Sequence, residues 1–272
     1  MNILKKITAV ILCFVLIGFS FTAYADEEKE PLKYVVLGDS ISRGSGITNR
    51  DKACFGRIIA DTNGYDYVNY GVDGLGSSGL LSMLHRADVI KDVSEADIIS
   101  ISIGGNNYLN SLLSLLFGGV LIRREAALDG VLGSFYDDFC NIISTILELN
   151  PETVIIVQTL YNPSTGPLRS LAGFAVKKLN DCFYRYESEN PGVITIADVA
   201  TALDGHAQCF EVIHPTAQGN VEIAEVLLDV LYDLGLGESR VPVIKTKGIN
   251  SIEYAVAIIL NPSKVITAVE YS

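Results

Sequence analysis

Short apolar runs alternate with longer amphipathic segments along most of the chain, without an internal repeat or a low-complexity tract. The short runs predict strands at Tyr34–Leu37, Tyr67–Tyr70, Ile98–Ile103, Val154–Gln158 and Val193–Ala197. The longer segments predict helices at Cys54–Asp61, Leu80–Arg86, Phe135–Leu149, Leu171–Glu187 and Ala217–Leu234. Strands that are apolar on both faces and alternate with helices indicate a parallel sheet covered on each side. We therefore expect an α/β fold.

The two ends of the chain depart from this pattern. Residues 1–25 combine a basic start, an apolar stretch and a small-residue site, which is the layout of a cleaved secretory signal peptide; an uncleaved anchor is the alternative. An acidic linker at 26–32 and one domain at 33–236 follow. Residues 237–272 form an extension. Its apolar stretch 254–260 is too short to span a bilayer, so we expect it to pack on the domain or to form an association surface.

Composition narrows the class of protein. With 49% apolar and 19% charged residues, the 272-residue chain is large enough for one globular domain, which excludes disorder, collagen and coiled coil. It carries 32 acidic and 20 basic residues, a net charge of −12, and such a surface repels phosphate backbones. We expect a secreted, extracellular protein that binds no nucleic acid and keeps no membrane span after signal cleavage.

Cysteine usage leaves the disulfides open. Beyond the signal region the chain has Cys54, Cys140, Cys182 and Cys209, an even number in a compartment where disulfides persist. Three pairings are possible, and four buried free thiols are the alternative. Because the spacing contains no CxxC pattern, no metal is predicted, and no cofactor is expected.

Glycine and polar residues follow the first three predicted strands, at the strand ends where parallel sheets bind ligands. The blocks are Gly38-Asp39-Ser40-Ile41-Ser42, Asn69-Tyr70-Gly71-Val72-Asp73-Gly74 and Gly104-Gly105-Asn106-Asn107. Before the last helix, Glu211-Val212-Ile213-His214-Pro215 places a carboxylate and an imidazole three residues apart. A serine, a histidine and a carboxylate that meet in one cleft are typical of a serine nucleophile with a neighbouring base.

The four blocks resemble those of SGNH (GDSL-type) hydrolases, a family of serine esterases and lipases named for Ser, Gly, Asn and His. Ser40, Gly74, Asn106 and His214 match the four family residues in order, over roughly residues 33–234. The resemblance implies a three-layer α/β/α sandwich with a flavodoxin-like parallel sheet. It also implies that Ser40 attacks the ester and that His214 takes its proton as general base.

The resemblance further assigns the oxyanion hole to the backbone N–H groups of Ser40 and Gly74 and to the Asn106 side chain. Two positions depart from the family pattern. Glu211 stands three residues before His214, where Asp is usual, and either orients the imidazole or leaves that task to a backbone carbonyl. Asn107 stands where Asp is usual, which is expected to change local hydrogen bonding and not a catalytic proton.

Two other histidines compete for the role of base. His85 is expected on the helix after the second block, with a structural or surface role. His206 has Asp204 two positions before it but lacks the following proline and helix, which favours His214. A His206-x-x-Cys209 metal pair lacks a second pair, so we assign it no metal.

Fewer residues indicate the substrate than indicate the reaction. Residues 109–122 form an unusually apolar segment that is expected to be either a lid for an acyl chain or a buried helix. Asp39, Asn107 and Tyr161 are candidate substrate-binding residues, because each follows a predicted strand. The sequence thus predicts a secreted carboxylic ester hydrolase acting on a lipid or small-molecule ester. Carbohydrate O-deacetylation and a non-catalytic surface-binding role are the alternatives.

Overall fold

The computed structural model describes residues 30–107, 124–245 and 266–268. By its contacts the chain divides into Met1–Pro31 and Leu32–Ser272, and every element named below belongs to the second unit. The strands are β1 Lys33–Gly38, β2 Asp66–Gly71, β3 Ile98–Ser102, β4 Val154–Gln158, β5 Thr195–Ala197, β6 Phe210–Glu211, β7 His214–Pro215, β8 Val243–Lys245 and β9 Ile266–Ala268. The α-helices are α2 Ser40–Arg43, α3 Arg50–Ala53, α4 Phe55–Asn63, α5 Ser77–Met83, α6 Ala87–Ser94, α8 Arg124–Leu149, α9 Arg169–Glu189, α10 Val199–Ala202 and α11 Ala217–Asp233. Two 3₁₀ helices are η2 Gly166–Leu168 and η3 Ala207–Cys209.

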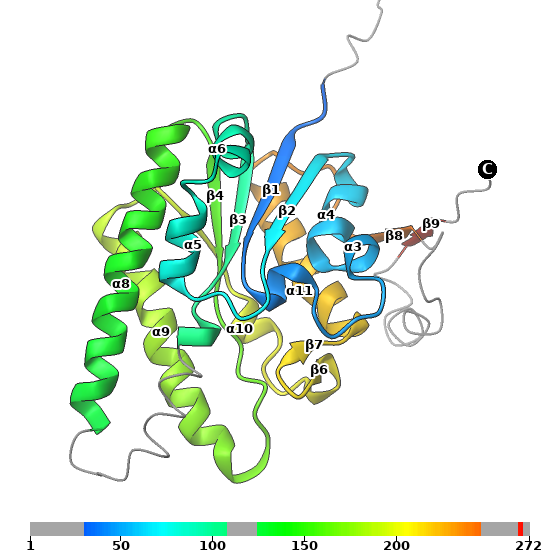
Figure 1. The fold of residues 1–272 in the computed structure, drawn as a ribbon. Coiled ribbons are helices and arrows are strands. Elements are labelled where there is room, and N and C mark those ends of the chain that lie inside the picture. Colours follow the sequence, from blue (N-terminus) through cyan, green and yellow to red (C-terminus); the bar gives the residue numbers. More distant parts are fainter. Residues whose placement is uncertain (1–29, 108–123, 246–265, 269–272) are drawn as a thin grey trace, which may run out of the picture. The chain divides into compact units, whose positions relative to one another are not determined.

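A five-stranded parallel sheet forms the centre of the domain, in the order β2-β1-β3-β4-β5 (Figure 1). In this order the chain reverses direction across the sheet between β1 and β3, which is the flavodoxin-like switch point. Loops at the carboxyl ends of these two strands diverge and leave room for a ligand. The predicted three-layer α/β/α fold is confirmed.

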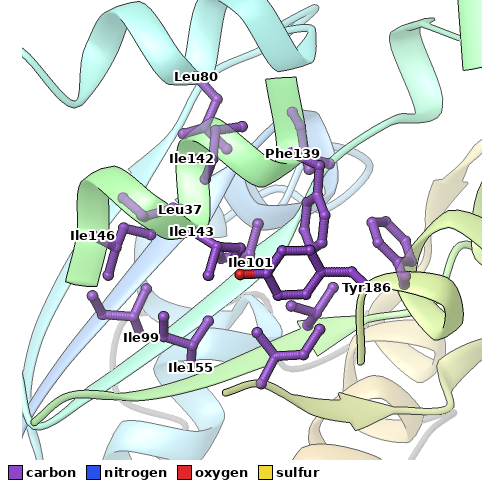
Figure 2. Close-up of a cluster of buried hydrophobic side chains, with 14 of the residues drawn as sticks. Leu37, Leu80, Ile99, Ile101, Phe139, Ile142, Ile143, Ile146, Ile155 and Tyr186 are labelled. Carbon is purple, nitrogen blue, oxygen red and sulfur yellow. The ribbon is translucent and has the colours of Figure 1, made fainter. Parts of the chain in front are cut away.

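Each face of the sheet carries its own hydrophobic core, because side chains alternate along each strand. On β1, Tyr34 and Val36 pack with residues of α4 and α11. Val35 and Leu37 point to the opposite face and pack with α5, α6, α8 and α9. Figure 2 shows this second core, where Leu37, Ile99, Ile101 and Ile155 from the strands meet Phe139, Ile142, Ile143 and Ile146 of α8.

Three predicted elements differ clearly from the structure. The helix predicted at 135–149 begins earlier, at Arg124. The predicted helix at 80–86 is wrong in its bounds: α5 ends at Met83, a turn follows, and α6 begins at Ala87. His85 therefore lies in that exposed turn and not on a helix. The predicted strand at 193–197 begins only at Thr195, because a turn containing Pro191 and Gly192 precedes it.

The described part of the C-terminal extension packs on α4. Ile244 is 1% exposed in the same core as α4, Val243 N donates to Thr62 Oγ1 over 2.8 Å, and Lys245 pairs with Asp61 at 3.4 Å. The apolar stretch 254–260, the predicted signal peptide and the segment 109–122 lie outside the described residues. Within the described ranges, no helix combines the length and apolar character needed to cross a membrane.

Candidate active site

Ser40 stands on a sharp turn between β1 and α2, at the switch point of the sheet. Gly38 leaves β1 with φ +140°, and a Cβ there would lie 2.1 Å from Ser102 O and 2.6 Å from Ser42 Oγ, so only glycine fits. Asp39 caps α2 by accepting from Ile41 N at 3.0 Å. The turn thus makes Ser40 the first residue of a short helix at the carboxyl end of β1.

His214 reaches Ser40 from the far end of the chain. Its Nε2 lies 3.0 Å from Ser40 Oγ, within hydrogen-bond distance, across a sequence separation of 174 residues. His214 begins β7, and α11 follows directly, capped by Thr216, whose hydroxyl accepts from Gly219 N at 3.2 Å. An imidazole in this position can accept the serine proton.

Gly46 packs against the back of this histidine. A Cβ on Gly46 would lie 2.9 Å from His214 Cβ and 2.7 Å from Pro215 O, and Gly46 has φ +105°. The loop after α2 therefore approaches β7 as closely as backbone atoms permit, which fixes the position of His214 relative to Ser40.

Glu211 is the cross-strand partner of His214 in the two-stranded β6–β7 hairpin. Its side chain is exposed and makes no hydrogen bond within the described residues. His214 Nδ1 likewise has no partner in the described part of the chain. Directly opposed residues of an antiparallel pair have Cβ atoms about 5 Å apart, so Glu211 and His214 are cross-strand neighbours without a hydrogen bond between them in the described residues.

The resemblance assigns three N–H donors to an oxyanion hole. Asn106 Nδ2 donates to Leu75 O at 3.0 Å and lies 3.5 Å from Asp39 Oδ2, which joins the third block to the loop after Gly74. The backbone N–H groups of Ser40 and Gly74 have no acceptor among the described residues. Asn106 lines the same pocket as Ser40, and preorganised N–H donors beside a serine can stabilise a developing negative oxygen.

Asp39 is a buried carboxyl beside these donors. It is 1% exposed, and burial raises its pKa from 3.8 to about 7. Bonds from the Ile41 and Asp39 backbone N–H groups oppose that rise, and the nearby Asp73 charge adds to it. Near neutral pH, this carboxyl titrates next to the Asn106 amide.

A pocket of about 120 Å³ opens beside Ser40, His214 and Asn106. Its apolar walls come from Leu160, Tyr161, Ala172, Val176 and Ile213. Tyr161 is 6% exposed, donates its hydroxyl to Ile213 O at 2.9 Å and stacks on Phe210 with ring centroids 4.4 Å apart. Tyr161 therefore both lines the pocket and holds the hairpin that carries His214.

The other sequence candidates lie outside this pocket. Asn107 accepts from Ser77 N at 3.0 Å and donates to Ser77 Oγ at 2.8 Å, at the start of α5. Ser77 in turn donates to Asp138 Oδ2 at 2.6 Å, so Asn107 helps join α5 to α8. His85 is exposed in its turn, and His206 is bonded to Glu222 at 2.6 Å. Cys54, Cys140, Cys182 and Cys209 are all free thiols.

Sequence reasoning missed the pocket walls supplied by α9. Ala172 and Val176 lie on a helix that the periodicity did predict, but small apolar residues on a helix carry no sign that they face a ligand. Their role follows only from the packing of α9 beside the loop after β4. Gly46 was missed for the same reason, since its partner is 168 residues away in the chain.

Comparisons with known proteins identify the family of this chain. Residues 36–221 match the model of the GDSL-like lipase/acylhydrolase family. The protein YpmR of Bacillus subtilis strain 168 is 29% identical over 155 residues, which cover 55% of this chain and 59% of that protein. The match thus spans less than two thirds of YpmR.

Solved structures share the fold at low identity. A lipase from a goat rumen metagenome has a TM-score of 0.63 and 22% identity, over 76% of this chain and 99% of its own. An extracellular lipase from Streptomyces rimosus has a TM-score of 0.59 and 19% identity, over 73% and 99%. A variant of Axe2, an acetyl-xylooligosaccharide esterase from Geobacillus, has a TM-score of 0.54 and 18% identity, over 74% and 94%. The family model covers most of the fold described above and all four blocks, and this chain belongs to the GDSL-like lipase/acylhydrolase family.

Proposed function

We propose that this protein hydrolyses carboxylic esters through an acyl-Ser40 intermediate. The contact of 3.0 Å between Ser40 Oγ and His214 Nε2, at the edge of an apolar pocket, carries the proposal. A hydroxyl becomes a strong nucleophile when a base removes its proton as it attacks, and a neutral imidazole at this distance meets that need.

The reaction proceeds in two halves. Ser40 Oγ attacks the ester carbonyl while its proton passes to His214 Nε2. The negative oxygen of the tetrahedral intermediate accepts bonds from Ser40 N–H, Gly74 N–H and Asn106 Nδ2. His214 then gives the proton to the leaving alcohol, and water repeats these steps to release the acid and restore Ser40.

Glu211 orients the imidazole in this proposal. It would accept from His214 Nδ1–H, which selects the tautomer whose Nε2 is free to receive the serine proton. The support is its cross-strand position opposite His214, and its longer side chain replaces the aspartate that is usual in the family.

The acyl group is short in this proposal. A pocket of about 120 Å³ with apolar walls is close in size to an apolar cavity of roughly 150 Å³ that holds a six-carbon ring. Acyl chains of up to about six carbons therefore fit among Leu160, Ala172 and Val176, whereas longer chains extend beyond the pocket.

One observation favours a second candidate, carbohydrate O-deacetylation. A wide polar hollow of about 690 Å³ borders the acyl pocket and shares Leu160, Asn162 and Val176 with it. Charged and hydroxyl-bearing side chains line the hollow, among them Arg169, Lys177, Asp181, Tyr184, Asp198 and Asp204. Such side chains suit the hydroxyl groups of a sugar.

Chromogenic esters with acyl chains of two to sixteen carbons, and acetylated xylo-oligosaccharides, test both candidates. The proposal expects kcat/KM to peak at four to six carbons, with Ser40→Ala inactive across the series. Turnover confined to acetyl groups, highest on the sugars, would favour deacetylation. The absence of any Ser40-dependent turnover would contradict both and leave a non-catalytic binding role.

We also infer that residues 1–25 are removed and that the protein works outside the cytosol. The support is the basic start, the apolar stretch and the Ala23-Tyr24-Ala25 site. Amino-terminal sequencing of the protein recovered from culture medium should give Asp26 as the first residue. Recovery of the intact chain from the cell pellet would contradict the inference.

A further inference from the structure

Three side chains with metal-binding chemistry meet outside the Ser40 pocket. His206 precedes η3, Cys209 ends it, and Glu222 lies in the second turn of α11. Their potential ligand atoms all lie within 4.8 Å of one another. His206 Nδ1 is 2.6 Å from Glu222 Oε2, and the buried Cys209 thiol lies next to the same two side chains.

We propose that His206, Cys209 and Glu222 bind a divalent transition-metal cation, with Zn²⁺ as the best fit. Imidazole nitrogen, thiolate sulfur and carboxylate oxygen are the three ligand types that zinc takes from proteins. A Cys209 thiolate and a Glu222 carboxylate together carry two negative charges, which a divalent cation neutralises. His206 has 46% of its side chain exposed, so the cation can enter from solvent and keep water as a fourth ligand.

The present geometry needs only small side-chain shifts to hold the ion. Zinc bonds of about 2.0–2.3 Å at tetrahedral angles place neighbouring ligand atoms roughly 3.3–3.6 Å apart. The three atoms here lie between 2.6 Å and 4.8 Å from one another. On binding, the cation replaces the hydrogen bond between His206 Nδ1 and Glu222 Oε2, the neutral imidazole binds through Nδ1 with its one proton on Nε2, and the thiol proton of Cys209 passes to water.

The site lies at the base of the hairpin that carries His214. Cys209 O accepts from Thr216 N at 2.8 Å, so the two ends of the hairpin segment meet next to the cysteine. Thr216 also caps α11, the helix that supplies Glu222. A cation held by all three residues therefore joins η3 to α11 and restrains both ends of the segment 209–216.

The sequence spacing indicates only two of these three ligands. The pair His206-x-x-Cys209 had no second pair, and no metal was predicted from it. The fold supplies a carboxylate instead, because the second turn of α11 packs against η3.

Cobalt is the probe for the test, since Co²⁺ bound to a thiolate absorbs strongly in the near ultraviolet. The purified full chain is treated with a chelator, freed of it and titrated with Co²⁺ and then with Zn²⁺. The expected result is one Co²⁺ per chain with the thiolate band, which Zn²⁺ abolishes. Zn²⁺ at a hundredfold excess over its Kd should raise Tm by roughly 5–10 °C.

Variants identify the ligands. His206→Ala and Glu222→Gln should each weaken binding by about 100-fold or more, beyond the losses that follow when an outer hydrogen-bond partner is removed. His85→Ala and Cys182→Ser, which change a histidine and a free thiol elsewhere, should bind as the parent does. Cys209 is fully buried, and its replacement can disturb folding. The His206 and Glu222 variants therefore decide whether these side chains bind the metal.

The absence of a thiolate band, or parental affinity in Glu222→Gln, would overturn the proposal. Equal weakening in His85→Ala would overturn it as well, because it would indicate binding to surface histidines. Ester hydrolysis plays no part in this readout, so the result is independent of the proposed function.

Discussion

Glu211 and His214 face each other across the β6–β7 hairpin, with only Val212 and Ile213 between them. Val212 holds φ 59°, a conformation that a β-branched residue rarely adopts, and 85% of its surface is exposed. The turn that pairs Glu211 with His214 thus keeps a strained backbone at Val212. Strain of this kind persists where the surrounding structure imposes it.

Glu211→Gln tests whether this carboxylate orients His214. We expect kcat to fall roughly 10²–10⁴-fold, because a neutral amide neither selects the tautomer nor stabilises the imidazolium. Glu211→Asp should keep most of the activity, since a carboxylate remains. Steady-state kinetics on a short-chain ester measures both. Glu152→Gln, in an exposed turn before β4, is the control, and equal effects at Glu152 and Glu211 would contradict the role.

Gly46→Ala tests the close packing behind His214. Gly46 and Gly64 both have positive φ, so an alanine at either should cost roughly 1–2 kcal/mol of unfolding free energy. Only at Gly46 does the new Cβ meet His214 Cβ and Pro215 O, whereas nothing lies within 4 Å of a Cβ at Gly64. We expect about a 100-fold loss of kcat in Gly46→Ala, as for a displacement of about 1 Å in an active site.

Gly64→Ala is the matched control for this loss. Urea denaturation of both variants measures the loss of unfolding free energy, and steady-state kinetics measures the loss of kcat. The two measurements together separate stability from activity. Similar kcat values in the two variants would show that the contact with His214 has no part in catalysis.

Asp39→Asn tests the buried carboxyl beside Asn106. The native state keeps the Asp39 proton up to about pH 7, whereas the unfolded chain loses it near pH 3.8. The native state therefore binds more protons in that window, and the contribution of Asp39 to stability falls as the pH rises from about 4 to 7. Asparagine keeps the cap on Ile41 N but does not titrate.

We therefore expect Asp39→Asn to gain stability relative to the parent at pH 8 and to gain least at pH 5. Urea denaturation of both proteins at the two pH values measures the difference. Activity should follow the same direction, because a negative Asp39 beside Asn106 opposes the developing oxyanion. A stability difference that is identical at pH 5 and pH 8 would show that Asp39 does not titrate in this range.

Ala172→Leu tests the acyl pocket. Ala172 is 7% exposed and lines the pocket from α9, so a leucine there should fill the space that a four- to six-carbon acyl chain would occupy. We expect kcat/KM to fall tenfold or more for hexanoyl esters and less than about threefold for acetyl esters, since each excluded methylene is worth about 1–3 kcal/mol. Comparison of the two substrates on one variant cancels any general loss of folded enzyme. If the ratio of kcat/KM for hexanoyl and acetyl esters does not change, the acyl group does not bind in this pocket.

Local patterns were enough to predict the architecture. The strand predicted at 154–158 matches β4 at both ends, and the helix predicted at 217–234 differs from α11 by one residue. Both segments are long or strongly apolar, so burial and propensity agree there. The predicted helix at 80–86 was wrong because Leu84 and His85 continue the apolar and polar pattern through residues that form a turn in the structure.

The sequence by itself determined the alternation of strands and helices, and it placed three reactive blocks at the ends of predicted strands and a fourth before the last helix. These properties depend on residues close together in the chain, and periodicity and turn chemistry report them directly. Tertiary structure decided which side chains meet. It brought His214 to Ser40 over 174 residues, buried Asp39 beside Asn106, and set Glu222 against His206 and Cys209. Such contacts depend on how whole helices pack on the sheet, and no local pattern encodes that packing.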